Sequence, residues 1–224
     1  MDTEMIEENV SRILESLPAG VTLVAAAKSR MPEEVEAAIR AGVTCVGHNY
    51  VQEARQMIPV VGHVVQWHMI GHLQRNKANK AARLFDMVET IDSWWLAVAL
   101  DQHCTAIGKV MPILIEINSG QEARKTGVLP EKVDELTRRL SQLQHLQVQG
   151  LMTMGPRFGD PEEARPYFRA TRETFARLAA LNLSHMTMRT LSMGMSNSYR
   201  VAIEEGANMV RIGSQIFGQR PSDG

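Results

Sequence analysis

Short apolar runs alternate along this chain with longer segments in which apolar residues recur every three to four positions. Short runs bounded by turn residues are typical of buried strands, whereas the longer spacing is typical of amphipathic helices. The pattern predicts a first helix with Ile6, Val10 and Ile13 on one face, followed by eight strands that alternate with helices. The predicted strands cover residues 21–28, 43–47, 64–70, 87–91, 111–117, 148–154, 189–193 and 209–213.

Several helix starts carry their own signals. Pro32 and Pro130 suit the first helical position, where a missing N–H does no harm. Asp160 is a strong N-cap candidate, and Ser93 and Ser196 are predicted to cap the helices that follow them. These predicted helix starts therefore agree with the helices that the spacing of apolar residues predicts.

Alternation of strands and helices predicts an α/β fold with a parallel sheet and helices outside it. Eight units within 224 residues suggest a single (β/α)8 TIM barrel with an extra N-terminal helix. A doubly wound open sheet is the alternative. With no linker or low-complexity tract, we expect one domain over residues 1–224.

Charge and composition exclude several classes of function. The net charge is −1, so no overall positive field exists to hold nucleic acid or an anionic membrane. No apolar run is long enough to span a membrane, and the acidic start lacks the form of a signal peptide. Two cysteines do not make a disulfide framework, which favours the reducing cytoplasm.

Lys28 is the first candidate for chemistry. It ends the first apolar run, and Arg30 follows closely. Apolar walls and a neighbouring cation disfavour the ammonium form, which frees the amine as a nucleophile. The alternative is a lysine that simply leaves the core for water. Barrel active sites lie at the carboxyl ends of the strands, and of six lysines only Lys28 combines that position with a buried strand. Lys125 follows the fifth strand, in a polar stretch.

The end of the eighth strand offers a site for an anion. Gly213 lets backbone amides approach a ligand closely, and Ser214 begins a helical turn that favours phosphate. Residues 191–196, after the seventh strand, add hydroxyls and amides. Because strands one and eight are neighbours in a closed barrel, this site lies near Lys28. An aldehyde on Lys28 with a phosphate in this cradle describes pyridoxal 5′-phosphate (PLP).

Five motifs occur in order along the chain, at residues 26–29, 47–53, 67–77, 191–196 and 210–218. Together they resemble the YggS/PROSC family of pyridoxal phosphate homeostasis proteins, which share a barrel with the N-terminal domain of alanine racemase. The resemblance covers nearly the whole chain. It implies a protein that stores, buffers or delivers PLP inside the cell.

The resemblance also implies a set of cofactor-binding residues. These are Lys28, Asn49, His68, Ser192, Met193, Arg211, Gly213 and Ser214. Lys28 would hold PLP as an internal aldimine, a Schiff base, and Arg211 would face the pyridine nitrogen. Ser192, Gly213 and Ser214 would hold the phosphate.

Asn49 and His68 would line the pocket of the ring.

The chain departs from the family at three places. His48 stands where glutamate is usual, Ala26-Ala27 where valine-serine is usual, and Met154-Gly155-Pro156 where an isoleucine-proline form is common. The role of the position of His48 is therefore open.

Arg211 weakens the case for efficient catalysis. A guanidinium does not give up its proton, so it disfavours a protonated pyridine nitrogen and makes the ring a poorer electron sink. A racemase needs a second acid or base, which alanine racemases take from a further domain. This chain ends at Gly224; Tyr50 and Tyr199 begin helices near the active face, and Tyr167 lies within a helix.

We therefore expect a PLP-binding protein, with no catalytic residue assigned and with apo-forms of PLP-dependent enzymes as candidate partners. A low-activity PLP-dependent amino-acid racemase is the alternative, and a Schiff-base aldolase that uses Lys28 directly is a third reading. A monomer is expected, because a complete barrel can stand alone. No metal is expected, because no carboxylate or cysteine joins His63, His68 and His72.

Overall fold

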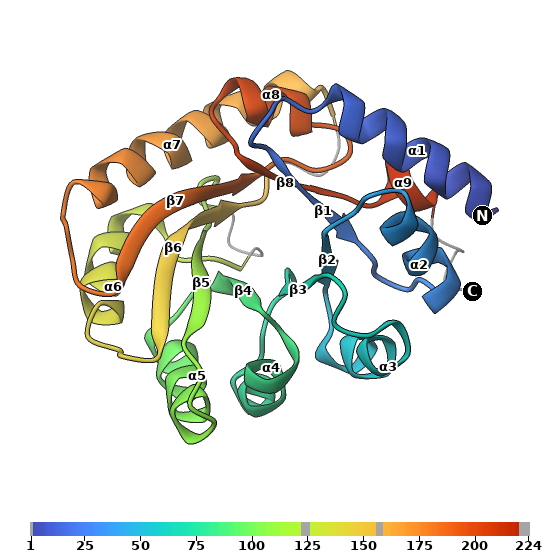
Figure 1. Ribbon diagram of the computed structural model, residues 1–224. Helices are drawn as coiled ribbons and strands as arrows, with labels where there is room; N and C mark the ends of the chain where they lie inside the picture. The colour runs from blue at the N-terminus through green and yellow to red at the C-terminus, as the bar shows by residue number, and fades with distance from the viewer. Residues whose placement is uncertain (1, 122–125, 156–158, 220–224) are drawn as a thin grey trace.

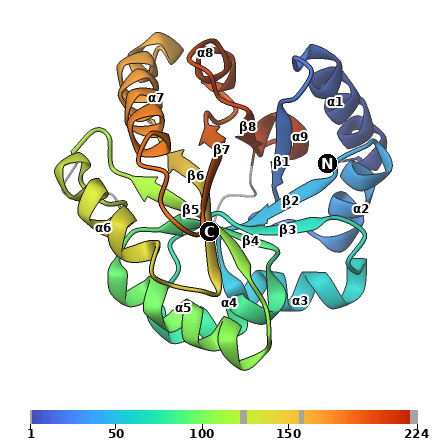
Figure 2. The same cartoon turned by 60° about the vertical axis from the view of Figure 1, so that its left-hand side comes forward.

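The strands close into a parallel barrel. In the computed structural model, which describes residues 2–121, 126–155 and 159–219, each strand pairs with the next along the chain, and β8 (Met209–Ile212) pairs with β1 (Thr22–Ala26). The helices lie outside the strands (Figure 1, Figure 2). The predicted barrel is confirmed, and closure excludes the open sheet. The other strands are β2 (Cys45–His48), β3 (Gln66–Met69), β4 (Met87–Ile91), β5 (Met111–Ile117), β6 (Leu146–Thr153) and β7 (Met186–Met193).

The predicted N-terminal helix lies beside α2 and α9, and the Asn9 side chain donates to the carbonyl of Ile216 at 3.2 Å. The α-helices are α1 (Thr3–Ser16), α2 (Pro32–Arg40), α3 (Val51–Val61), α4 (Ala78–Leu84), α5 (Trp94–Ala106), α6 (Val133–Leu140), α7 (Arg165–Ala179), α8 (Tyr199–Glu204) and α9 (Ser214–Phe217). The 3-10 helices are η1 (Arg75–Lys77), η2 (Pro130–Lys132) and η3 (Pro161–Ala164).

The main core lies between barrel and helices, and the barrel interior has its own small clusters. Apolar side chains that face this interior are Val24, Cys45, Met87, Leu114, Met152 and Met209. Glu89, Glu116 and Arg211 come two residues later than Met87, Leu114 and Met209. Because side chains alternate along a strand, these charged groups face the same interior, nearer its carboxyl end. All three are buried.

Several predicted strand boundaries are wrong, one of them at the site. The first strand ends at Ala26, two residues before Lys28, because the amide of Arg30 donates to the carbonyl of Ala27 and turns the chain. The third strand begins two residues later than predicted; Val64 is 70% exposed and lies outside it. Strands β6 and β7 begin earlier than predicted, because their first residues still pair with a neighbouring strand.

The predicted capping serines also need correction. Helix α8 begins directly after Ser198, not Ser196, and the hydroxyl of Ser196 accepts from the amide of Gly213 at 3.3 Å. Ser93 holds the N-cap position of α5, but its side chain makes no capping hydrogen bond. Ser196 therefore belongs to the barrel mouth rather than to a helix start.

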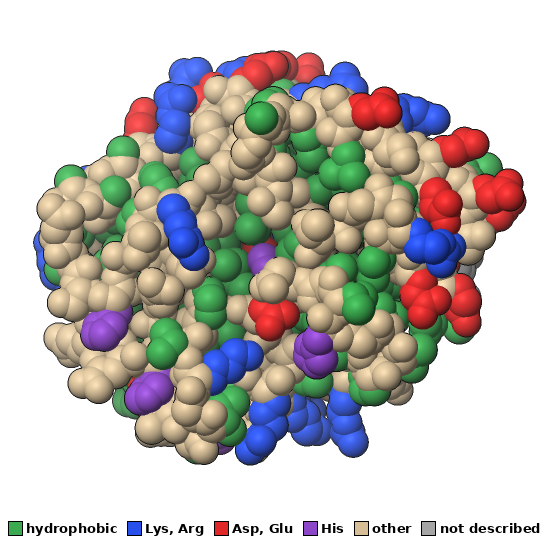
Figure 3. Space-filling model, viewed as in Figure 1, with side chains coloured by type: hydrophobic (Ala, Val, Ile, Leu, Met, Phe, Trp, Pro, Cys, Tyr) green, Lys and Arg blue, Asp and Glu red, His purple; other side chains and the backbone are tan. Residues whose placement is uncertain are grey.

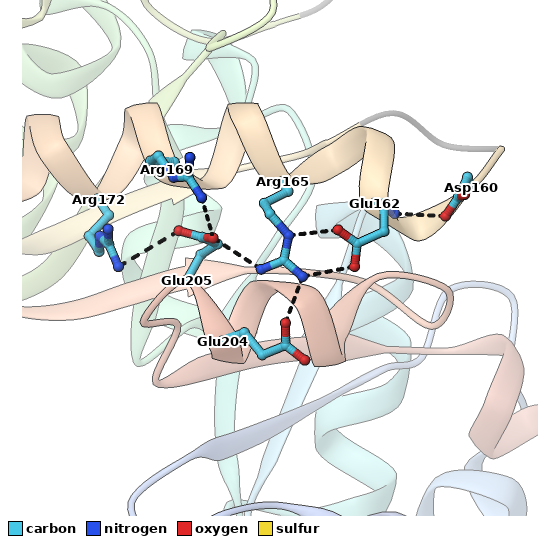
Figure 4. A network of polar contacts seen from close by, with 7 residues as sticks. All are labelled: Asp160, Glu162, Arg165, Arg169, Arg172, Glu204 and Glu205. Carbon is cyan, nitrogen blue, oxygen red and sulfur yellow. Dashed lines mark hydrogen bonds and ion pairs between the residues drawn. The ribbon is translucent and has the colours of Figure 1, made fainter.

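A network of ion pairs joins α7 to the end of α8 (Figure 4). Arg165 donates to Glu204 at 2.6 Å and to Glu205 at 3.1 Å. Glu205 is buried and pairs with two more arginines of α7, Arg169 and Arg172. The predicted N-cap, Asp160, accepts from the amide of Glu162 at 2.9 Å. The network therefore fixes the end of α8 against α7.

The basic segment of residues 75–80 lies at the surface, where Arg75 and Lys80 are exposed. Lys and Arg side chains gather along the lower edge of the molecule, below α4, in Figure 3. In the ranges that the structure describes, no helix has the length and apolar character needed to cross a bilayer.

Candidate functional site

A cavity of about 640 Å³ opens at the carboxyl ends of the strands. Five of the eight predicted site residues line it, namely Lys28, Asn49, Arg211, Gly213 and Ser214. The volume is in the range of small-molecule sites, and the position is the one at which barrel enzymes and binding proteins place their ligands.

Lys28 lies half-buried in the turn that follows β1. Its Nζ lies 5.1 Å from the centre of the Tyr50 ring, and it donates no hydrogen bond to the side chains and carbonyls of the described residues. The pairing of β1 with β8 brings this turn beside Gly213, as predicted. The amine therefore faces the cavity without a strong partner.

The described residues that line the cavity include three cations and no carboxylate. Two of the cations are Lys28 and Arg211. The third, Arg30, donates to the carbonyls of Phe217 at 2.8 Å and Gly218 at 2.7 Å, and so fixes the segment after α9. A cavity with this balance attracts an anionic ligand.

Gly213 keeps the mouth open where β8 meets β1. A Cβ atom at this position would come within 3.2 Å of the carbonyl oxygen of Ala26 and 3.4 Å of its side chain. Among the described residues, the Gly213 amide donates one long hydrogen bond, to the hydroxyl of Ser196 at 3.3 Å. An amide and a hydroxyl are thus at hand for an anion, which fits the phosphate end of PLP; the amine of Lys28 fits its aldehyde.

The other three predicted residues do not line the cavity. Met193 is buried in the outer core, between barrel and helices. His68 and Ser192 face the barrel interior, where both donate to Glu89 at 2.7 Å. The only proton of the Ser192 hydroxyl therefore goes to Glu89, and a phosphate would have to draw it away. The phosphate role of Ser192 stays a prediction.

Glu89 is the centre of a buried polar network. Arg211 donates to Ser192 at 2.5 Å and to the carbonyl of Thr153 at 2.8 Å, and lies 3.9 Å from Glu89. Burial would raise the pKa of Glu89, but the His68 and Ser192 hydrogen bonds and the charge of Arg211 hold it below its ordinary value. The network therefore joins a carboxylate to the guanidinium that lines the cavity.

Sequence reasoning missed both buried carboxyls of the barrel interior. Glu89 and Glu116 each stand alone in a strand that is otherwise apolar or neutral. A single carboxylate in a fully buried strand needs a polar partner, so it marks a polar interior. That signal was available in the sequence.

Glu116 is the less satisfied of the two. Its Oε1 accepts from the hydroxyl of Thr126 at 2.7 Å, whereas its Oε2 has no hydrogen-bond partner in the part of the chain that is described. Burial raises the pKa of Glu116; the charge of Asp92 adds to this, and Thr126 and Arg211 oppose it. The folded protein thus holds this proton more tightly than the unfolded chain.

We expect Glu116→Gln to stabilise the protein increasingly as the pH rises. Below the unfolded pKa, both states of the wild type carry the proton and no charge is buried. Above the folded pKa, the wild type buries a negative charge that glutamine does not carry, which costs about 1.4 kcal/mol for each unit by which folding raises the pKa. Urea unfolding at pH 4, 6 and 8 measures the difference. A loss of stability that is the same at every pH would contradict this expectation.

The remaining candidate residues that the sequence singles out are histidines, tyrosines, one lysine and one proline. Within the residues described, no three His, Cys, Asp or Glu side chains are placed to hold a metal ion. His72 pairs instead with Asp92 at 3.4 Å. Tyr50 is half-exposed beside Lys28, and Tyr199 is buried. Lys125 and Pro156 lie outside the described residues.

Comparison with known proteins places this geometry in a family. The sequence profile described as "Alanine racemase, N-terminal domain" matches residues 1–221. The chain belongs to this family. The solved structure of alanine racemase from Corynebacterium glutamicum, at 19% identity and a TM-score of 0.80, has a similar fold; this chain covers 64% of it.

Two relatives in the alanine racemase N-terminal domain family match most of the chain. The "Pyridoxal phosphate homeostasis protein" of Aquifex aeolicus is 36% identical over 224 residues, which cover 95% of this chain and 97% of the relative. That of Escherichia coli K12 is also 36% identical, over 91% of this chain and 87% of the relative. The structure of PipY of Synechococcus elongatus with PLP bound has 32% identity and a TM-score of 0.88, and covers 95% of this chain and all of PipY. The predicted resemblance is confirmed.

Proposed function

We propose that this protein binds PLP and serves its homeostasis by storing, buffering or delivering the cofactor. The observation that carries the proposal is the cavity shared by Lys28, Arg211 and Gly213 at the mouth of the barrel. It offers one amine for the aldehyde, and its described lining is cationic and holds no carboxylate, which suits the phosphate. Relatives named for PLP homeostasis, and PipY with PLP bound, support the choice of ligand.

Each residue has a proposed part. Nζ of Lys28 condenses with the aldehyde to a Schiff base, with release of water. The amides at Gly213 and Ser214, with Ser192, hold the phosphate. Arg211 faces the pyridine nitrogen; bound PLP would otherwise supply an electron sink, which this fixed guanidinium weakens.

The remaining residues shape the pocket. Asn49 lines the part of the cavity that would hold the PLP ring. His68 acts indirectly, through its hydrogen bond to Glu89 in the barrel interior. Met193, whose side chain lies in the outer core, contributes through its backbone. The proposal includes one domain over residues 1–224 that acts as a monomer in the cytoplasm and exchanges PLP with apo-forms of PLP-dependent enzymes. Two free, buried cysteines are in keeping with that compartment.

A weak amino-acid racemase is the second candidate. Tyr50 favours it, because a half-exposed phenol beside Lys28 could serve as a second acid or base. Incubation of the PLP-loaded protein with single enantiomers of alanine and serine decides between the two. Sustained conversion that is lost in Tyr50→Phe would favour the racemase, and no conversion would favour the homeostasis role.

The PLP proposal is tested by trapping the covalent link. We expect PLP followed by borohydride to label one peptide, that of Lys28, because reduction fixes a Schiff base at the amine that formed it. Mass spectrometry of the digested protein locates the label. Lys109 is an internal control, since its amine already donates to the carbonyls of Ala82 and Phe85. Labelling spread evenly over the lysines would contradict a specific site.

A further inference from the structure

The turn that carries Lys28 adopts a conformation that needs support. Ser29, the next residue, has a φ of 58°, in the left-handed region that non-glycine residues rarely occupy. Such a residue persists where the surrounding structure holds it. The turn itself supplies only the hydrogen bond from the amide of Arg30 to the carbonyl of Ala27, at 3.3 Å. Support therefore has to come from another element.

Glu53 supplies that support from helix α3. Its Oε2 accepts a hydrogen bond from the amide of Ser29 at 3.3 Å, across 24 residues of sequence. The neighbouring His48 ring, the Ser29 amide and the charge of Lys28 hold the pKa of Glu53 below its ordinary value, although burial opposes them. The carboxylate therefore stands beside the Lys28 turn in its charged form.

His48, the last residue of β2, lies close to the same carboxylate oxygen. Its ring is fully buried and stacks on Trp67, with centroids 5.7 Å apart. Neither ring nitrogen has a hydrogen-bond partner within the described chain, and Nδ1 lies 3.8 Å from Oε2 of Glu53. An unpaired buried polar group is unfavourable. A small movement of the carboxylate toward His48 would give Nδ1 a partner and weaken the bond to Ser29.

We propose that Glu53 is a positioning residue for Lys28, and that His48 competes with the Ser29 amide for its Oε2. The Lys28 turn then has two forms. In one, Glu53 holds Ser29 and the amine is fixed toward the cavity; in the other, Glu53 turns to His48 and the lysine is released. The consequence for cofactor release rests on the proposed function, whereas the contact itself is a property of the ligand-free chain.

Amide hydrogen exchange of Ser29 in the PLP-free protein tests the contact. We expect about tenfold faster exchange in Glu53→Ala, since a hydrogen bond to a charged group is worth about that factor. Glu53→Gln keeps an acceptor, so its Ser29 exchange rate should lie between those of the wild type and Glu53→Ala. Glu33→Ala removes an exposed carboxylate from the first turn of α2 and should leave Ser29 unchanged. Unchanged exchange in both Glu53 variants, with urea unfolding showing them folded, would overturn the positioning role.

His48→Phe tests the competition, and its expected effect on the rates is opposite to that of Glu53→Ala. Phenylalanine keeps the stacking on Trp67 but offers Glu53 no nitrogen, so Ser29 exchange and PLP release should both slow, whereas Glu53→Ala should speed both. Equal or faster rates in His48→Phe would overturn the competition. If the wild type bound no PLP, the proposed function would fail, while the exchange rates would still decide the contact.

Discussion

Replacement of Glu89 by leucine is expected to lower the free energy of unfolding by about 3–5 kcal/mol. Glu89 is fully buried, accepts from His68 and Ser192, and lies 3.9 Å from Arg211. Without it, Arg211 would remain buried with no carboxylate so near, and His68 would lose its acceptor. Chemical unfolding in urea measures the loss.

Two further variants show whether charge or shape carries this effect. Glu89→Gln keeps an acceptor but removes the charge, and should cost less than leucine does. The double variant Glu89→Leu, Arg211→Met removes both charges and should recover part of the loss, because the unpaired guanidinium is gone. The single variant Arg211→Met completes the cycle, and a double-variant loss equal to the sum of the Glu89→Leu and Arg211→Met losses would contradict charge pairing at this site.

Gly150→Ala is expected to cost more than about 4 kcal/mol or to prevent folding, which is at the upper end for single substitutions. Gly150 has a φ of 154° at the register shift between β6 and β7. A Cβ atom there would lie 1.7 Å from the carbonyl oxygen of Thr190, which is backbone and cannot turn aside. Soluble yield and urea unfolding measure the effect.

Gly20→Ala is the matched control. Gly20 also has a positive φ, 87°, but a Cβ atom there meets nothing within 4 Å. Its expected cost is about 1–2 kcal/mol, from backbone conformation alone. If Gly150→Ala cost no more than Gly20→Ala, the close approach of β6 and β7 would be contradicted.

The order of the elements was predictable because periodicity is a local property. Apolar spacing and turn residues gave the alternation of strands and helices, and eight units within 224 residues implied closure. Exact ends were less predictable, because pairing with a neighbour decides them. β1 ends at Ala26 because the residues that follow turn away from the barrel. The hydroxyl of Ser196 accepts a hydrogen bond from the Gly213 amide instead of capping a helix.

Sequence alone could bring together those candidate site residues whose proximity follows from the fold. Lys28 and Gly213 follow neighbouring strands, so a closed barrel places them in one cavity. Sequence alone could not show which partners each side chain contacts. The bond from Ser192 to Glu89, the outward side chain of Met193 and the contact of Glu53 with Ser29 depend on three-dimensional packing. The sequence shows Glu89 as a lone charge in an apolar strand, but it does not show which residues pair with it.

The central claim is that Lys28 binds PLP in the cavity at the barrel mouth. The most direct measurement is the visible absorption spectrum of PLP-stripped protein during titration with PLP, for the wild type, Lys28→Ala and Lys80→Ala. Lys80 is an exposed lysine of α4 that does not line the cavity. The wild type and Lys80→Ala should develop a band distinct from free PLP that saturates at one equivalent, and Lys28→Ala should not. The same band at the same stoichiometry in Lys28→Ala would contradict the claim.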